Sequence, residues 1–334
     1  MSYVRNDRGT GNAVAMVLLL VGGVGGGCGG APSSPLLSFG EGGIPDSAPS
    51  SAPTAPRGGS NAPASQGSGS GISANGRDGG GSSVLIPGGD CPESAKLVYV
   101  TGEGSKLYSF YPPTFTFTLI GSLDCLADYS PTHMTVDRTG TAWIAAWPSS
   151  TDTGSSLFTA STTNAACSRV ANWRAQSQGY FTDFALTFVG LKSPDTTLYL
   201  LGDDGTQAAL GAFDTESGTL VTVGPVNASA PAAGGDMTTN GDGTLYFLQD
   251  ASPLSLYEIE PSNASVLNDW TPGATGGGDQ ALAFYGGSFY LFEDNVVYAF
   301  DTATQATKRL GEAPLSVTGA GESTCVPRVA PPLP

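Results

Sequence analysis

The sequence predicts an all-β protein: a β-propeller of five four-stranded blades, preceded by a long disordered linker. Three observations predict it: short strand-like runs between turn residues, a unit that recurs four times, and two chain ends that complement each other. From residue 91 onward, runs such as TLYLLG, TLYFLQD and SFYLF alternate with clusters of Gly, Asp, Asn, Ser and Pro. No run in this region has the period of an amphipathic helix. Many short, evenly spaced strands are typical of a sandwich, a barrel or a propeller.

A recurring unit favours the propeller among these three. In each of four rows, a His or Asp starts an apolar strand seven residues before a turn glycine, and an aromatic residue follows the turn. The leading residues are His133, Asp183, Asp236 and Asp279. The aromatic residues, which we expect to pack between blades, are Trp143, Tyr199, Tyr246 and Tyr290. The rows repeat roughly every 43 to 53 residues, which is the length of a propeller blade.

The fifth blade is predicted from the two ends together. The stretch AKLVYVTGEGSKLYSFYPPTFTFTLIGSL matches the second, third and fourth strands of the unit, and PLSVTGAGESTC matches only the first. Pairing the two ends in one blade closes the ring and removes an exposed sheet edge. In this register Cys325 faces Cys91, which predicts a Cys91–Cys325 disulfide and leaves Cys125–Cys167 as a second pair.

Short motifs also resemble a known repeat. The run VYVTGEGSKLYSF resembles the YVTN-type propeller repeat, and the turns at Asp214-Thr215 and Asp301-Thr302 are similar to those of bacterial surface propellers. The resemblance implies a bacterial secreted or lipoprotein β-propeller. It specifies no function, because one fold serves many.

The N-terminus reads as an export signal. Arg5 and Arg8 precede an apolar run over residues 13–24, and small residues then lead to Cys28. This arrangement resembles a bacterial lipobox, although Gly25 stands where such motifs usually carry Leu. The resemblance implies a lipid on Cys28, and ordinary signal-peptide cleavage nearby is the alternative.

The composition changes between the export signal and the predicted propeller. Gly, Ser, Pro and Ala dominate the region before Cys91, and such a chain cannot bury enough apolar surface to stay folded. The expected organisation is a signal peptide over 1–28, a disordered linker over 29–90, a β-propeller over 91–326 and a tail over 327–334.

Charge and composition exclude several classes of function. Only 13 Lys and Arg stand against 29 Asp and Glu, for a net charge of −16, and this balance repels nucleic acid and acidic membrane surfaces. Any contact with a membrane is therefore expected only through an N-terminal lipid, and the chain is expected to be a monomer. With a single His, no His-based zinc cluster is expected, and the chain has no G-x-S-x-G nucleophile elbow.

The four leading residues are the candidate site. First strands of propeller blades line the central channel, so His133, Asp183, Asp236 and Asp279 are expected to converge at its mouth. Three roles remain open: capping of turns by Asp side chains, binding of a cation such as Ca²⁺ by all four residues, and acid–base chemistry by the three carboxylates. We favour capping and expect no other cofactor.

The leading functional hypothesis is therefore an exported binding module. It would sit in the cell envelope as a lipoprotein, or be secreted, and bind a protein or glycan at the cell surface. The alternative is a glycosidase-like propeller hydrolase that uses Asp183, Asp236 and Asp279. We favour a protein that is not an enzyme.

Overall fold

A computed structural model describes residues 91–151, 153–174, 179–190, 197–204, 206–226, 234–274 and 276–331. The chain divides into two units, Met1–Arg77 and Asp78–Pro334, and all of the described residues lie in the second. The predicted signal peptide, linker and lipidated Cys28 lie outside the described residues. No helix among the described residues is long and apolar enough to cross a membrane.

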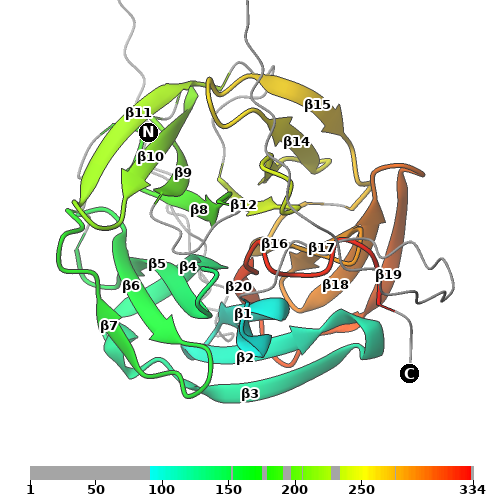
Figure 1. The fold of residues 1–334 in the computed structure, drawn as a ribbon, viewed down its shortest axis with the longest axis horizontal. Helices are drawn as coiled ribbons and strands as arrows, with labels where there is room; N and C mark the ends of the chain where they lie inside the picture. Colours follow the sequence, from blue (N-terminus) through cyan, green and yellow to red (C-terminus); the bar gives the residue numbers. More distant parts are fainter. Residues whose placement is uncertain are drawn as a thin grey trace, which may run out of the picture. The chain divides into compact units, whose positions relative to one another are not determined.

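The described chain folds into five antiparallel sheets of four strands arranged around an axis, which confirms the predicted five-bladed propeller (Figure 1). The inner strands are β20 (Val317–Gly321), β4 (Tyr129–Val136), β8 (Phe184–Phe188), β12 (Gly235–Thr239) and β16 (Gln280–Tyr285). The second strands are β1 (Val98–Gly102), β5 (Thr141–Pro148), β9 (Thr197–Asp203), β13 (Leu245–Gln249) and β17 (Ser288–Glu293).

The remaining two strands of each blade lie farther from the axis. The third strands are β2 (Lys106–Tyr111), β6 (Ser156–Ser161), β10 (Ala208–Asp214), β14 (Ser255–Ile259) and β18 (Val296–Asp301). The outer strands are β3 (Thr116–Ser122), β7 (Cys167–Arg169), β11 (Thr219–Pro225), β15 (Val266–Trp270) and β19 (Ala306–Glu312). Three short 3₁₀ turns complete the described elements: η1 (Glu93–Lys96), η2 (Pro112–Thr114) and η3 (Asp124–Leu126).

Burial rises from the rim to the axis. The inner strand β8 is buried at every position, because neighbouring inner strands cover both of its faces. The outer strands β3, β11 and β19 contain only exposed and half-buried residues, because they lie at the rim of the ring, where solvent reaches them. The core lies between blades, as predicted for the aromatic residues: Trp143 packs edge-on against Phe188 of the next blade, and Tyr246 packs against Phe289.

One blade is built from both ends of the described chain, as predicted. Its strand order is β20-β1-β2-β3, with Tyr99 opposite Gly321 and Thr101 opposite Gly319. The inner strand β20 also packs against β16 and β4, so it closes the ring on both sides. Both predicted disulfides are present, Cys91–Cys325 and Cys125–Cys167.

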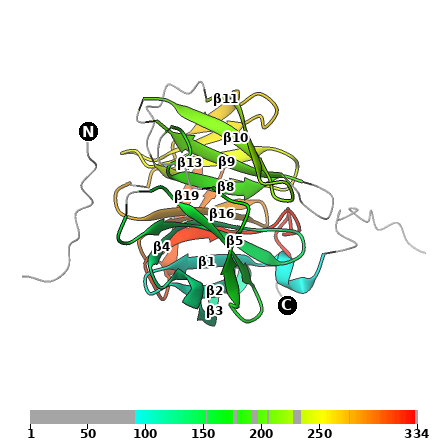
Figure 2. The same cartoon turned by 90° about the vertical axis from the view of Figure 1, so that its left-hand side faces the viewer.

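The two faces of the ring follow from the strand directions. Inner strands begin at one face, which we call the entry face; it carries the hairpins between second and third strands and the connections between blades. They end at the other face, which we call the tail face. In Figures 1 and 2 the η1 turn and the segment after β20, coloured cyan and red, lie together at one end of the axis.

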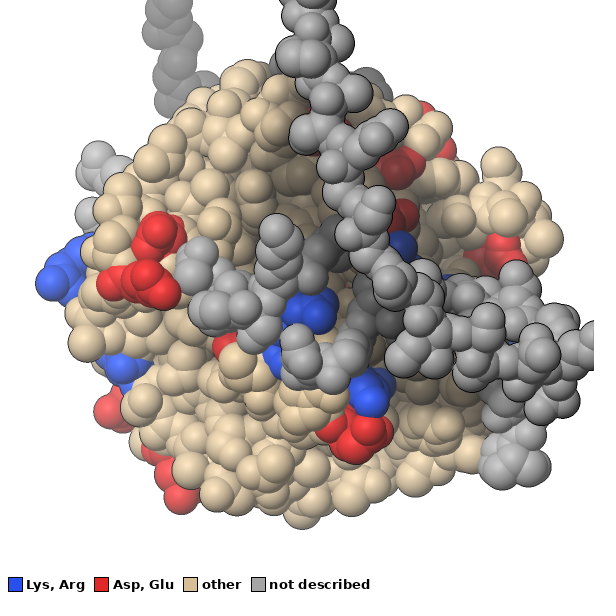
Figure 3. Space-filling model, viewed as in Figure 1, with Lys and Arg blue, Asp and Glu red and all other residues tan. Residues whose placement is uncertain are grey.

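The segment Glu322–Arg328 crosses the tail face. It contacts the hairpins after the inner strands of several blades: Arg138 Nη1 donates to Thr324 Oγ1 at 2.9 Å, and Thr324 Oγ1 donates to the Gly190 carbonyl at 2.8 Å. The Gly286 N–H donates to the Pro327 carbonyl at 2.7 Å, so packing continues beyond residue 326, where the sequence predicted a separate tail. Figure 3 views the ring as in Figure 1 and shows acidic and basic side chains on the same face.

Close contact at the axis requires glycine in β20. A Cβ atom on Gly319 would lie 2.9 Å from the Cα and carbonyl carbon of His133, closer than real Cβ contacts allow. Gly319→Ala is therefore expected to lower the free energy of unfolding by about 1–3 kcal/mol, through overpacking between β20 and β4. Urea denaturation measures this change.

A glycine on an outer strand provides the control for that substitution. A Cβ atom on Gly224 of β11 would have its nearest neighbour, the Asn263 carbonyl oxygen, at 3.5 Å, which is ordinary contact. We expect Gly224→Ala to change stability by less than about 0.5 kcal/mol. Equal effects of the two substitutions would show that β20 and β4 are not packed as closely as described.

Candidate functional site

The pairing of inner with second strands places the axial residues in two levels. The level nearer the entry face contains Gly319, His133, Ala185, Asp236 and Ala281 of the inner strands. Their partners on the second strands are, in the same order, Thr101, Ala145, Leu201, Leu248 and Phe292. Two residues farther along each strand, the next level contains Gly321, Thr135, Thr187, Thr238 and Ala283. Small residues at most of these positions let the five strands approach the axis closely.

The predicted equivalence of four leading residues is wrong for two of them. Only His133 and Asp236 share a level, whereas Asp183 and Asp279 lie two residues earlier than Ala185 and Ala281. The hairpins after the inner strands differ in length, so counting back from a turn glycine does not give a constant register. The β16–β17 hairpin, for example, has only Gly286-Gly287 between its last pair, Tyr285 and Ser288.

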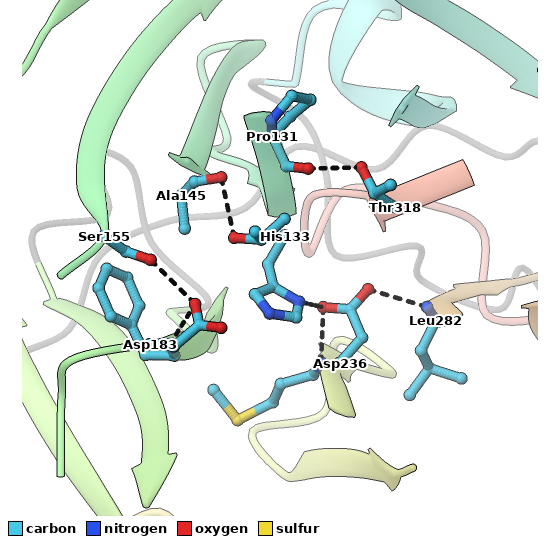
Figure 4. Close-up of polar contacts among 11 residues, drawn as sticks. Pro131, His133, Ala145, Ser155, Asp183, Asp236, Leu282 and Thr318 are labelled. Carbon is cyan, nitrogen blue, oxygen red and sulfur yellow. Dashed lines mark hydrogen bonds and ion pairs between the residues drawn. The ribbon is translucent and has the colours of Figure 1, made fainter. Parts of the chain in front are cut away.

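His133 and Asp236 meet across the axis, although they come from blades that are not neighbours. His133 Nδ1 lies 3.3 Å from Asp236 Oδ1, beside the blade that contributes only Ala185 at this level (Figure 4). The Asp236 side chain is fully buried, and the His133 side chain is 12% exposed. The axis therefore holds one imidazole and one carboxylate side by side.

Backbone donors hold the Asp236 carboxylate in place. The N–H of Met237 donates to Asp236 Oδ1, and the N–H of Leu282 in the next blade donates to Oδ2, both at 2.9 Å. Burial raises the pKa of Asp236, while His133 and these two N–H groups oppose the rise. Asp236 thus ties together three of the five blades.

A second buried acid, Glu322, lies directly after β20, and the sequence-based prediction did not include it. Thr238 Oγ1 donates to Glu322 Oε1, and the Phe284 N–H donates to Oε2 at 3.0 Å. The Glu322 carbonyl accepts a bond from the Val136 N–H at 3.3 Å. The pKa of Glu322 is raised to about 8, chiefly by burial and to a smaller extent by the charge of Asp236, while its hydrogen-bond donors oppose the rise.

Sequence carries one signal that could have found Glu322. Its position in the unit is occupied in the other blades by Val136, Phe188, Thr239 and Phe284, as the strand pairings show. An ionisable side chain at a position that is otherwise mainly apolar indicates a buried charge with local partners. The signal depends on the register, and the register depends on the hairpin lengths.

Asp183 and Asp279 lie apart from this pair. Asp183 is exposed, and its Oδ1 accepts bonds from Ser155 Oγ at 2.9 Å and from the Phe184 N–H at 3.1 Å (Figure 4). The backbone of Asp279 is bonded to Asp294 at the β17–β18 turn. Among the described residues, no three His, Cys, Asp or Glu side chains are grouped so that they could hold a metal ion. The structure does not bring the four candidates together as one site.

The axial groups can hold the ring together and can store a proton. Asp236 and Glu322 form hydrogen bonds with groups from several blades, and such networks rigidify a core. With a pKa near 8, Glu322 is mostly protonated at neutral pH. Glycoside hydrolysis needs two carboxyl groups that can reach a bound sugar. Of the three candidates, Asp236 is fully buried, Asp279 is half-buried and Asp183 is exposed.

The sequence matches no protein-family model, and no curated protein sequence matches it significantly. Among solved structures, a chain from a crystal structure of a nidogen/laminin complex is similar, with a TM-score of 0.44 and 9% identity, over 67% of this chain and 97% of that one. An engineered GH43 glycoside hydrolase with endo-xylanase and exo-arabinofuranosidase activity is similar, with a TM-score of 0.40 and 11% identity. That match covers 55% of this chain and 42% of the enzyme chain. At these identities the similarity concerns the fold, so the role of each residue rests on its own geometry.

Proposed function

We propose that the chain is an exported binding module, tethered by its N-terminus or secreted, whose entry face binds a cell-surface protein with a basic surface. It acts by contact and not by chemistry. The observation that carries this proposal is the charge of the loops on the entry face.

Acidic side chains gather on those loops from several blades. The exposed carboxylates of the described entry-face loops are those of Glu103, Asp124, Asp128, Asp183, Asp204 and Asp294. The same described loops carry one exposed basic side chain, that of Arg174. On the tail face, by contrast, Arg138 bonds to the crossing segment and the exposed Arg328 is part of it. The exposed acids of the described tail-face loops are fewer: Glu93, Glu216 and Asp242.

Such a face selects partners by charge. A ring of like charges attracts a surface rich in Lys and Arg, speeds the encounter and repels acidic partners, with an effect that falls as salt screens it. Loops of several blades contribute, so a folded partner could contact them at once. The charge favours a basic protein over an uncharged glycan.

The axial residues support binding over hydrolysis. The buried carboxylates Asp236 and Glu322 already accept several hydrogen bonds within the protein, and Asp236 is fully buried. A general acid or base must reach its substrate within hydrogen-bonding distance. These groups are better placed to stabilise the ring.

The proposal includes the N-terminal features of the sequence. The apolar run over residues 13–24 and the Cys28 that follows small residues support export and a lipid tether. Mass spectrometry of the mature N-terminus tests this part. A lipid-modified Cys28 supports the tether, a cleaved and unmodified N-terminus supports secretion, and an intact residue 1 on the protein from its native cell contradicts export.

A matched pair of triple variants tests the binding face. The entry-face variant, Glu103→Gln with Asp124→Asn and Asp128→Asn, removes three exposed charges that have no side-chain hydrogen bond described. The tail-face control, Glu93→Gln with Glu216→Gln and Asp242→Asn, removes three exposed charges from the other side. Binding of a small basic protein to the immobilised chain is measured by interferometry at low and high salt.

We expect the entry-face variant to bind the basic probe on the order of tenfold more weakly at low salt, and the control to bind almost as wild type does. A small acidic protein should not bind. Equal loss in both variants, or a wild-type chain that binds neither probe, contradicts the proposed face. Turnover of a glycan panel that is abolished by Asp236→Asn would instead establish the hydrolase.

A further inference from the structure

A second group of polar side chains, two of them buried and one half-buried, lies on the entry face, between the blade of β12–β15 and the blade of β16–β19. We call Asp250, Gln280 and Glu293 the interblade cluster. Gln280 starts β16 and pairs directly with Glu293 at the end of β17, so their side chains lie on the same face of the sheet. Gln280 Nε2 donates to Asp250 Oδ1 at 2.9 Å, which joins the third member from the neighbouring blade.

One glycine loop brings the two carboxylates together. The Gly276 N–H donates to Glu293 Oε1 at 2.7 Å, and the next N–H, that of Gly277, bonds to Asp250. Adjacent amide groups in one loop can contact both side chains only if the carboxylates are neighbours. A Cβ atom on Gly276 would also clash with the Ala251 carbonyl oxygen, so this oxygen lies against the same loop.

The cluster contains an oxygen atom without a partner. Gln280 is only 7% exposed, and its Oε1 atom is buried and accepts no hydrogen bond. Rotating the amide would not help, because it would place this oxygen against Asp250 where the Nε2 donor now lies. Leaving a buried amide oxygen without a hydrogen-bond donor or a cation is costly.

We propose that the interblade cluster is a calcium site, with Asp250, Glu293 and the Gln280 amide oxygen as side-chain ligands. Ca²⁺ prefers six to eight oxygen ligands drawn from carboxylates, amide and backbone carbonyls, and water. The cluster supplies two carboxylates and one amide oxygen, and the Ala251 backbone carbonyl lies against the loop that contains Gly276. The all-oxygen set favours Ca²⁺ over Zn²⁺ or Cu²⁺, which select nitrogen and sulfur.

The cation would also compensate for burial. Burial raises the pKa of Asp250, since the charged form is penalised there, and a bound cation supplies the opposite charge. Because Asp250 and Glu293 come from adjacent blades, the ion would crosslink them at the entry face. This site is distinct from the axial residues and does not rest on the proposed binding of a basic protein.

Calcium titration of the chelator-treated full chain tests the site. By calorimetry we expect one Ca²⁺ per chain, with a Kd of about 10⁻⁴ to 10⁻³ M, as in extracellular modules, and a rise in Tm on addition. Glu293→Gln keeps an acceptor for Gly276 and removes the charge, so it should weaken Ca²⁺ binding on the order of tenfold. Asp204→Asn, which removes an exposed acid of the same face, should leave the affinity unchanged.

Gln280→Met gives a second variant should Glu293→Gln fail to fold. It removes the unpartnered oxygen at similar size, so the calcium-free chain should be at least as stable while the Ca²⁺-induced rise in Tm is lost. Terbium luminescence gives a local readout, because the Tyr298 hydroxyl bonds to Glu293 and can sensitise a nearby ion. Tyr298→Phe should lower this emission and leave calorimetric Ca²⁺ binding in place.

Three results would overturn the site. The first is no saturable uptake of Ca²⁺ at about 10 mM, well above that range. The second is an affinity unchanged by both Glu293→Gln and Gln280→Met. The third is binding abolished by His133→Asn or Asp236→Asn and retained in the cluster variants, which would place the ion on the axis.

Discussion

Replacing Cys91 and Cys325 together by Ser is expected to lower the free energy of unfolding by up to about 5 kcal/mol. The disulfide joins residues 234 positions apart, so it removes more entropy from the unfolded chain than a short crosslink does. It also holds the segment after β20 to the start of the composite blade. Urea denaturation of oxidised wild type and of the double variant measures the loss.

The second disulfide provides the matched control. Cys125 and Cys167 are 42 positions apart, so the loop-entropy model gives the Cys125→Ser, Cys167→Ser variant a smaller loss, about 4 kcal/mol at most. The Cys91 and Cys325 variant is therefore expected to be the less stable of the two. A larger loss for the Cys125 and Cys167 variant would show that ring closure depends less on the terminal crosslink than on the link between the first two blades.

The second large effect is a dependence of stability on pH that originates at Glu322. Burial raises its pKa in the folded chain to about 8, well above the unfolded value. Between these two pKa values the folded chain keeps a proton that the unfolded chain releases, so stability falls as pH rises from about 4.5 to about 8. The fall attributable to this one group is on the order of 5 kcal/mol, and it levels off above pH 8.

Glu322→Gln should remove this contribution. The Gln amide oxygen can accept from Phe284 N–H and its nitrogen can donate to Thr238 Oγ1, so the contacts survive without a titrating group. We expect the variant to match or exceed wild-type stability at pH 8 and to show a flatter profile between pH 5 and 8. The measurement is urea denaturation at several pH values.

The same profile in both proteins would contradict a buried neutral Glu322. Asp236 also has a raised pKa, so part of the slope should remain in Glu322→Gln. Comparing Asp236→Asn with Glu322→Gln separates the two contributions, since each variant removes one titrating carboxyl. Asp236→Asn also loses one acceptor, because the Met237 and Leu282 N–H groups donate to different oxygens of Asp236, so its loss of stability at all pH values is subtracted before the slopes are compared.

The fold could be predicted from sequence because its signals are local and repeated. Each blade carries its own signals: a turn glycine and an aromatic residue on the second strand, such as Tyr199 or Tyr246. The incomplete units at the two ends of the propeller sequence indicate the fifth blade. The Cys91–Cys325 disulfide followed from that pairing of the ends. These features need no knowledge of how the blades meet.

The candidate site could be predicted only in part, because it depends on register across blades. His133 and Asp236 were identified because, in both blades, the turn glycine lies at the same distance from the inner-strand residue of this level. Asp183 and Asp279 were misplaced by two residues, because the hairpins of their blades differ in length. Glu322 was not identified, because its role comes from Thr238 and Phe284, which are far away in sequence.

The position of β20 determines when the protein can finish folding. β20 is the last described strand in the chain, and it pairs with β1, the first. During synthesis the inner edge of β1 therefore stays unpaired until the four other blades have been translated. A message cut short before Val317 would yield a polypeptide with most of its sheets formed and a permanent gap in the circle. Such a product exposes strand edges that can pair with other chains and aggregate. Correct folding of the ring therefore depends on complete translation of β20.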